Sequence, residues 1–179
     1  MSGNRTPSQT VGPFFEFGLA TRPEIVAAGA PGAIAIAGRV LDGAGVPVPD
    51  GLVEIWGADA AGSYAAGSGC WGRCQTGPDG GFRFTTVKPG AAHDPDGPPE
   101  APHVKVLCFA RGLLKPVLTR LYFPDEADAN AADPVLGALG AGERATLVAA
   151  ADGAAGYRFD IHLQGDGQTV FFTTPAFGL

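Results

Sequence analysis

Short apolar runs separated by turn-forming residues are the feature that most constrains how this chain can fold. The sequence has 28 glycines and 16 prolines, which stand between the runs rather than in repeats of their own. Within several runs, among them 33–36 and 157–161, residue types alternate with the period of two that is typical of a β-strand. The intervening segments, such as 42–45 and 77–81, have the composition of tight turns. We therefore expect an all-β fold, an antiparallel two-sheet β-sandwich or a barrel, with strands at 33–41, 52–58, 81–87, 103–110, 117–123, 144–149, 156–164 and 168–173.

Helices are expected only in short pieces. Asp125 is a suitable helix N-cap and is followed by acidic residues, which predicts a short helix at about 125–132. Pro134 should end or kink any helix in this region. Residues 20–31 are a second candidate for a turn of helix. The Pro- and Gly-rich segment 88–102 predicts a long surface loop.

The first 30 residues are expected to form an arm outside the sandwich. Residues 6–15 follow neither a helical nor a strand period. The arm carries three aromatic rings close together, Phe14, Phe15 and Phe17. Because exposed aromatic rings are unfavourable in a monomer, a partner surface should cover them. We therefore divide the chain into an N-terminal arm, 1–30, which packs on a partner subunit, and a β-sandwich domain, 31–179.

Composition and charge argue against several classes of protein. The formal net charge is −6, and the 12 basic residues are scattered. Nucleic-acid binding is not expected, because phosphate neutralisation requires grouped cations. No apolar stretch approaches the length of a membrane span. The start of the sequence has no apolar secretion signal, so a cytoplasmic location is expected by default.

The cysteines and several aromatic residues are expected to be structural. The chain has an odd number of cysteines, which predicts free thiols, at Cys70, Cys74 and Cys108. The spacing of the first two would suit a zinc half-site, but no second pair follows. Tyr64 is expected to be a packed ring with its hydroxyl hydrogen-bonded. Trp56 and Trp71 are expected to anchor the core or an interface.

The stretch 100–126 carries the pattern of half a metal site. Residues i and i+2 of a strand share one face, so His103 and Lys105 should lie side by side. Two histidines at this spacing would form a metal-binding pair. The ammonium of Lys105 has no lone pair to offer a metal ion. This face can therefore supply half a site at most, and His103 is expected to be a hydrogen-bonded structural histidine.

Several motifs together resemble the intradiol ring-cleavage dioxygenase family. The segment 6–14, TPSQTVGPF, is similar to the family's opening, and 38–64 resembles its strand–turn–strand core. Similar segments cover nearly the whole chain, at 72–73, 79–90, 101–103, 109–112, 119–123, 157–161 and 169–172. The combination is specific, whereas any one motif alone is weak. The resemblance implies a two-sheet β-sandwich of the kind shared with transthyretin-like proteins, with an extended N-terminal arm and one or two short helices.

The resemblance also implies where the iron of such an enzyme would be held. Catalytic members of this family hold a non-haem ferric ion with two tyrosines and two histidines. His103 occupies the first histidine position and Lys105 replaces the second. One of the two ligand tyrosines would follow the run 88–90, but here that run is followed by Ala-Ala-His. The other tyrosine would lie between Tyr64 and Gly72, and no tyrosine stands there. The implied Fe(III) is therefore bound by a homologous partner subunit of the β type, not by this chain.

The activity implied by the resemblance is Fe(III)-dependent intradiol cleavage of protocatechuate by O₂, which gives 3-carboxy-cis,cis-muconate. The chain would act as the iron-free subunit of a hetero-oligomer and would line part of the substrate pocket. Relatives also cleave hydroxyquinol or catechol, so the choice among these substrates stays open at this point.

The resemblance carries a small set of substrate-binding residues onto this sequence. They are Thr10, Gly12 and Pro13 in the arm and Arg120 in the run 119–123. No catalytic residue and no metal ligand is assigned to this chain. The alternative for Arg120 is a surface arginine that is paired with Asp125 or Glu126.

A second interpretation belongs to a different class of protein. The strand–turn–strand at 38–48 also resembles transthyretin-like and carboxypeptidase-regulatory-like modules, which bind or support without redox chemistry. A non-catalytic binding module would leave the arm and the run 119–123 without an explanation.

Overall fold

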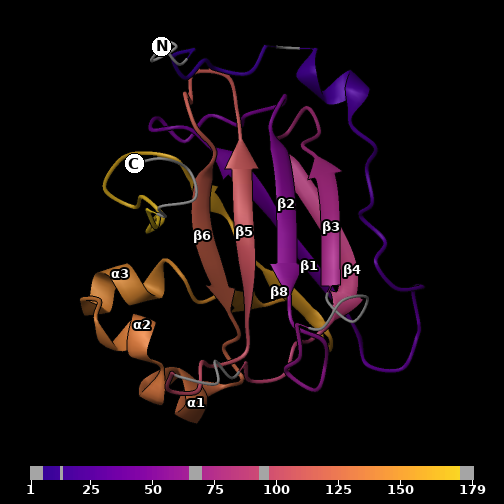
Figure 1. Ribbon diagram of the computed structural model, residues 1–179, viewed down its shortest axis with the longest axis vertical. Coiled ribbons are helices and arrows are strands. Elements are labelled where there is room, and N and C mark those ends of the chain that lie inside the picture. The colour runs from indigo at the N-terminus through magenta and orange to yellow at the C-terminus, as the bar shows by residue number, and fades with distance from the viewer. Residues whose placement is uncertain (1–5, 13, 65–69, 93–96, 174–179) are drawn as a thin grey trace, which may run out of the picture.

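Two β-sheets packed face to face form the body of the protein (Figure 1). The computed structural model describes residues 6–12, 14–64, 70–92 and 97–173. Its strands are β1 (Ala33–Leu41), β2 (Leu52–Gly57), β3 (Cys70–Gln75), β4 (Gly81–Val87), β5 (His103–Phe109), β6 (Val117–Tyr122), β7 (Ala150–Ala151), β8 (Gly156–Arg158) and β9 (Ile161–His162). The predicted β-sandwich is confirmed, and β1 and β4 have the predicted bounds.

One sheet contains four strands in the order β3-β2-β5-β6, and every neighbouring pair is antiparallel. Its strands stand upright at the front of Figure 1. The strand β3 was not predicted, because its sequence lacks an apolar alternation. Pairing with β2 along its full length holds it in the sheet.

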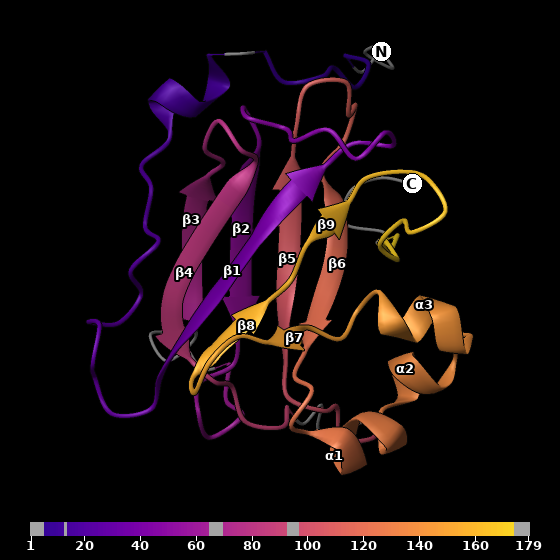
Figure 2. The same cartoon turned by 180° about the vertical axis from the view of Figure 1, so that it is seen from behind.

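The other sheet follows the order β4-β1-β8-β7, with β9 also paired to β1 (Figure 2). The pairing of β1 with β4 is antiparallel, whereas β8 and β9 run parallel to β1. The predicted strand 156–164 is therefore two short strands with a break between them. At the break, the Phe159 backbone crosses close over Gly38, where a Cβ atom would lie 1.8 Å from the Phe159 carbonyl oxygen. Only glycine fits this crossing.

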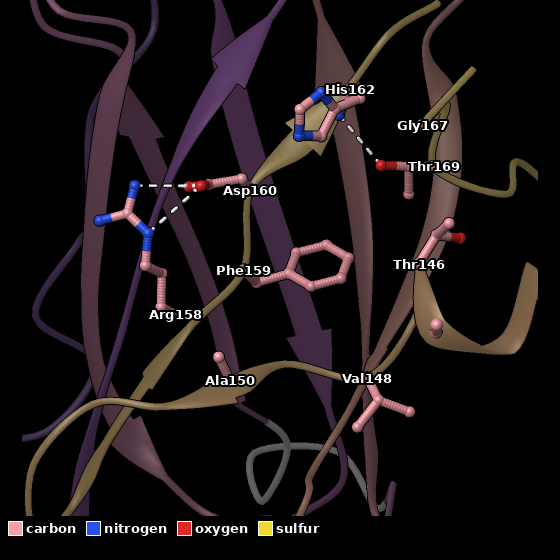
Figure 3. Close-up of a pocket in the computed structure, with 10 residues that line it drawn as sticks. Thr146, Val148, Ala150, Arg158, Phe159, Asp160, His162, Gly167 and Thr169 are labelled. Carbon is pink, nitrogen blue, oxygen red and sulfur yellow. Dashed lines mark hydrogen bonds and ion pairs between the residues drawn. The ribbon is translucent and has the colours of Figure 1, made fainter. Parts of the chain in front are cut away.

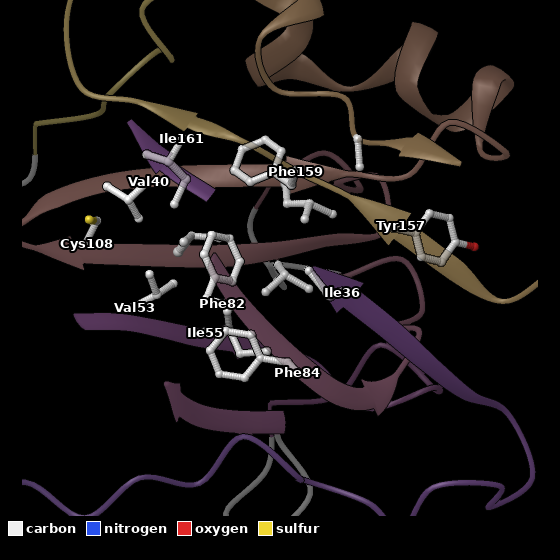
Figure 4. Close-up of a cluster of buried hydrophobic side chains, with 14 of the residues drawn as sticks. Ile36, Val40, Val53, Ile55, Phe82, Phe84, Cys108, Tyr157, Phe159 and Ile161 are labelled. Atoms are coloured by element: carbon white, nitrogen blue, oxygen red, sulfur yellow. The ribbon is translucent and has the colours of Figure 1, made fainter. Parts of the chain in front are cut away.

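The core lies between the two sheets and is formed by inward-facing residues of both sheets (Figure 4). Phe84 on β4 and Val106 on β5 are at most 1% exposed. Burial of a large apolar side chain stabilises a fold by about 1.5–3 kcal/mol, so this alternation fixes which face of each strand points inward. On β5 the inward residues are Val104, Val106 and Cys108, which leaves His103 and Lys105 on the outer face.

The helices are short, and three lie in sequence between β6 and β7 beside one end of the sandwich (Figure 1). They are α1 (Ala127–Ala132), α2 (Pro134–Gly137) and α3 (Ala141–Ala145), and a 3₁₀ turn, η1 (Phe15–Gly18), precedes β1. The predicted helix at 125–132 is confirmed over most of its length. Asp125 is not its N-cap, because Glu126 holds that position and Asp125 pairs with Lys88.

Pro134 ends the first helix as predicted and also begins the next one. It is the first residue of α2, where its missing N–H costs nothing, and Asp133 caps that helix. The predicted strand 144–149 is wrong, because Arg144 and Ala145 lie in α3 and Val148 makes only an isolated bridge to Tyr122. The Glu143 carboxylate accepts a hydrogen bond from the Gly140 N–H at 2.8 Å and favours a helix start there.

Three further predictions need correction. Residues 20–31 contain no helix and instead make isolated bridges at Arg22 and Glu24. The predicted strand 168–173 is reduced to one bridge at Phe172. The loop 88–102 is not fully at the surface, because Ala92, Ala101 and Pro102 are buried; residues 93–96 lie outside the described part of the chain.

Two sequence-based expectations concern the membrane and the thiols. In the part of the chain that the structure describes, no helix is long and apolar enough to cross a membrane. The three cysteines are free, as predicted.

Candidate functional site

The outer face of β5 and β6 brings together the residues that the sequence singled out. The register of this antiparallel pair places His103 opposite Tyr122 and Lys105 opposite Arg120. These four side chains share one face because each strand buries the alternate residues in the core. The prediction that His103 and Lys105 lie side by side is confirmed.

His103 is a buried structural histidine. It is 2% exposed, and its Nδ1 lies 2.8 Å from the carbonyl oxygen of Ala101. Its Nε2 is 3.5 Å from a carboxylate oxygen of Glu100 and has no hydrogen-bond partner among the described residues. Burial lowers the pKa of His103, and the positive charge of Arg120 lowers it further. The imidazole is therefore neutral near pH 7, and the predicted structural role is confirmed.

Arg120 is held in place by two neighbours on the same face. Its Nη2 donates to Glu100 at 3.0 Å, and its Nη1 donates to the hydroxyl of Tyr122 at 3.3 Å. The alternative pairing with Asp125 or Glu126 is wrong, because Lys88 contacts both carboxylates, at 2.7 and 2.5 Å. The guanidinium is thus partly buried and held in one orientation, which favours a role in binding an anionic ligand over that of a mobile surface arginine.

Lys105 packs against aromatic faces. Its Nζ lies 5.1 Å from the ring centre of Trp56 and 5.0 Å from that of Tyr64. Burial lowers the pKa of Lys105, and the nearby charge of Arg120 adds to this effect. These two cation–π contacts hold the ammonium beside Arg120.

The predicted anchors agree with expectation only in part. Trp56 and Trp71 are 43% and 36% exposed, which rules out the core alternative and leaves the interface alternative as a prediction. The hydroxyl of Tyr64 is buried with no hydrogen-bond partner among the described residues, contrary to prediction. Burial raises the pKa of Tyr64, and the charge of Glu100 raises it further.

A pocket of about 310 Å³ opens beside the two cations. Its walls come from both strands, from α2 and from the chain near the C-terminus, and are formed by Lys105, Leu118, Arg120, Val135, Phe172 and Thr173. The pocket therefore combines two positive side chains with apolar surface, which is the usual make-up of a small-molecule site.

A second pocket, of about 450 Å³, lies at the other sheet (Figure 3). Its cation, Arg158, donates to Asp160 from two nitrogens, at 3.0 and 3.2 Å. Asp160 also accepts the N–H of Arg39 at 2.9 Å. Since this cation is already paired within the chain, the pocket offers less charge to a ligand than the one lined by both Lys105 and Arg120.

Among the described arm residues, Thr10 contacts the hairpin before β6 and not Arg120. The hydroxyl of Thr10 accepts the N–H of Gly112 at 2.7 Å, in the hairpin before β6. Gly12 is exposed, and no atom lies within 4 Å of a Cβ built there. Pro13 lies outside the described residues. The arm crosses the hairpin end of the sandwich, whereas Arg120 lies further along β6 (Figure 1).

Glu100 and Asp133 contact the residues of this face, and the sequence did not single them out. Glu100 connects Arg120 and His103, and Asp133 accepts the hydroxyl of Tyr122 at 3.2 Å. Both lie outside the strands, so no periodic signal marked them.

The donor set does not fit a ferric ion. Among the four positions that the resemblance assigns to iron ligands, His103 alone keeps a ligand type, and its Nδ1 is engaged by a backbone carbonyl. In the described residues, no group of three or more His, Cys, Asp and Glu side chains is placed to hold a metal. His93 lies outside those residues.

The fold and the comparisons with known proteins define a class of protein, the intradiol ring-cleavage dioxygenases. The chain belongs to that family: a model described as Dioxygenase matches residues 20–165. The dioxygenase domain of a dioxygenase–carbohydrate-binding fusion from Streptomyces sp. SirexAA-E is 28% identical, with a TM-score of 0.64 over 90% of this chain and 99% of that one. Catechol 1,2-dioxygenase from Acinetobacter sp. ADP1 shares the fold, with a TM-score of 0.62 at 20% identity over 84% of this chain and 60% of that one.

Two relatives carry a more particular name. The protocatechuate 3,4-dioxygenase alpha chain of Burkholderia cepacia is 44% identical over 94% of this chain and 96% of its own length. The alpha chain of Pseudomonas putida is 42% identical over 93% of this chain and 95% of its own. The beta chain from Burkholderia cepacia is 34% identical over 74% of this chain and 64% of its own. This membership favours the dioxygenase interpretation over the binding-module alternative.

Proposed function

We propose that this chain is the iron-free α-type subunit of a protocatechuate 3,4-dioxygenase, paired with a homologous β-type subunit that holds the Fe(III). The observation that carries this proposal is the 42–44% identity with two alpha chains over 93–94% of the chain. The assembly would cleave protocatechuate with O₂ to 3-carboxy-cis,cis-muconate. We place it in the cytoplasm.

The proposal that the β-type subunit holds the iron is supported by the chemistry of the outer face of β5. An ammonium stands at Lys105, where a second neutral imidazole would be needed, and it repels a metal cation rather than binding it. Stable sites for transition metals need several ligands with supporting hydrogen bonds. One histidine that is already bonded to Ala101 does not meet that requirement.

In this proposal the chain contributes binding and orientation to a pocket that it shares with the β-type subunit. Arg120 would bind the negatively charged substrate, since Glu100 and Tyr122 hold its guanidinium in a fixed direction. Thr10, Gly12 and Pro13 of the arm would line the same substrate pocket. Phe14 and Phe17 are 72% and 76% exposed, which supports an arm that packs against another subunit.

The test is to purify the chain alone and together with a homologous β-type chain. We expect iron and protocatechuate-dependent O₂ uptake only in the assembly, with the metal on the β-type chain after the subunits are separated. An Arg120→Met variant should raise the KM for protocatechuate in the assembly, whereas Arg39→Met, at an exposed ion pair, should not. Iron retained by the lone chain, together with unaided turnover, would refute the proposal.

A further inference from the structure

The N-terminal arm contacts its own sandwich at the hairpin of residues 110–116, which joins β5 to β6 (Figure 1). The hydroxyl of Thr10 accepts the N–H of Gly112 at 2.7 Å. Gly112 has a φ of 90°, a conformation that residues other than glycine rarely adopt. The turn that presents this N–H to the arm therefore depends on glycine.

Apolar contacts support this hydrogen bond. Thr10 and Gly112 are both exposed, so water competes for their polar groups and the bond alone would hold the arm weakly. Val11 and Phe15, however, are half-buried. The ring centre of Phe15 lies 6.2 Å from that of Phe109, the last residue of β5. The arm is thus held by one hydrogen bond and by two apolar side chains.

A gap of about 130 Å³ remains between the arm and the hairpin. Val11 lines it from the arm, and Leu113, Leu114 and Pro116 line it from the hairpin. The gap is well below the roughly 300–1,000 Å³ of usual ligand sites, so we interpret it as the space between two packed segments. Release of the arm would expose these apolar side chains to water, which opposes release.

The arm has two sides of different character. Phe15 faces the sandwich, whereas Phe14 and Phe17 are 72% and 76% exposed, with their ring centres 5.6 Å apart. One side of the arm is therefore held by this chain, and the other presents two rings to a partner. An arm that served only the partner would not need contacts with its own hairpin.

The arm is held at one end of the face that carries the candidate site. Phe109 and Lys105 share the outer face of β5, because they are four residues apart. That step corresponds to roughly 13 Å at a rise of about 3.3 Å per residue. The N–H of Phe15 also donates to the carbonyl of Gly12 at 3.2 Å. Contact with Phe109 therefore fixes Gly12 beside the same face as Arg120.

We propose that the hairpin 110–116 anchors the arm on its own subunit before the β-type subunit binds, with Gly112 as a positioning residue that acts through Thr10. The anchor sets where Gly12 stands when the assembly forms, and the two exposed rings dock on the β-type subunit. An arm that is ordered in advance loses less conformational freedom on association. The inference rests on the proposed function and gives Thr10 a role that the resemblance does not, a contact with the chain's own hairpin.

The first test measures hydrogen exchange in the full-length chain alone, by NMR for the Gly112 N–H and by mass spectrometry for the arm. Thr10→Val keeps the shape of the side chain but removes the acceptor. It should speed exchange of the Gly112 N–H about fivefold, as expected for the loss of one neutral hydrogen bond. Thr10→Ser keeps the acceptor and should exchange at the wild-type rate. An unprotected Gly112 N–H in the wild type would overturn the inference.

Phe14 and Phe15 provide a matched pair of variants. Phe15→Ala should release the arm in the lone chain and speed its exchange several-fold. Phe14→Ala removes a ring from the exposed side, so it should leave exchange of the arm unchanged and weaken binding of the β-type chain. Equal effects of the two variants on exchange of the arm would contradict the anchor.

The second test uses the assembly with the β-type chain. Leu113 lines the gap beneath the arm, so Leu113→Ala should raise the KM for protocatechuate about fivefold, with kcat and iron content kept. Thr10→Val should add little in this background, since both changes act through one anchor. An unchanged KM, or a loss confined to kcat or iron content, would refute the positioning role.

The two tests also separate the anchor from the proposed function. Failure of the wild-type assembly to hold iron or to turn over would count against the proposed function. Hydrogen exchange in the lone chain would still decide whether the hairpin holds the arm.

Discussion

Replacement of Asp133 by alanine should loosen the candidate site and the end of the sandwich together. This carboxylate joins three elements, because it accepts from the N–H of Ala101 before β5, from the hydroxyl of Tyr122 on β6 and from the N–H groups of Val135 and Leu136 in α2. It is 1% exposed, so water does not replace it easily. Its loss leaves several buried donors without an acceptor.

The magnitude follows from those bonds. Removal of a helix N-cap costs about 1 kcal/mol, within a range of about 0.5–2. Each buried donor that loses its acceptor costs about 1–3 kcal/mol, and Ala101 and Tyr122 contribute one each. We therefore expect Asp133→Ala to lower the free energy of unfolding by about 3–7 kcal/mol, a large share of the roughly 5–15 kcal/mol that is typical of a domain. Asp133→Asn should cost less, because its amide oxygen can still accept from α2 and Tyr122.

The assay is denaturant unfolding of the chain, followed by circular dichroism, with the midpoint and the slope compared between variants. Tyr122→Phe is the matched control. It removes one donor and should cost about 1 kcal/mol in the wild type, but much less in the Asp133→Ala background. A loss below about 1 kcal/mol for Asp133→Ala, with an unchanged slope, would refute the view that Asp133 joins these elements.

Two further predictions concern buried titratable groups. Burial raises the pKa of Cys108 to about 12. This thiol should therefore stay unlabelled by a thiol reagent at pH 8 in the native chain and react after unfolding. Mass spectrometry of labelled peptides measures this, and label on Cys108 of the native chain would contradict the prediction. The pKa of His103 is lowered in the folded state by burial, so its contribution to stability is present above the unfolded pKa of about 6.5 and is lost as pH falls towards the folded value. Unfolding midpoints at pH 7 and pH 5 should differ less in His103→Gln than in the wild type, and an equal difference would contradict this assignment.

The parts of the fold that follow local rules could be predicted from the sequence. The bounds of β1 and β4 match because both strands alternate buried and exposed residues between clear turns. The same period placed His103 and Lys105 on one face. That was enough to find half of the candidate site before any contact was known.

Elements fixed by distant partners could not be predicted in this way. The strand β3 contains Gly72, where a Cβ atom would lie 2.8 Å from the carbonyl oxygen of Arg22, so a distant segment crosses it closely. The break before β9 depends on how Phe159 passes over Gly38. Neither contact leaves a periodic trace in the sequence, because glycine also marks ordinary turns.

The contacts within the candidate site could not be predicted from the sequence either, because residues in loops make them. Glu100 lies at the end of a Pro-rich segment, and nothing in its neighbours indicates that it reaches both Arg120 and His103. The alternative considered for Arg120 was a pair with the acidic residues that follow it in sequence, yet those residues pair with Lys88. Proximity along the chain was a poor guide where a loop folds back over the sheet.

Lys105 changes the chemistry that this face can perform, and does not merely remove a ligand. A site for a metal cation needs neutral or negative donors that converge. Here a neutral His103 stands beside two cations, and Glu100 balances one of them. The same pair of strands therefore offers net positive charge to whatever enters the neighbouring pocket, and the ligand that suits it is an anion.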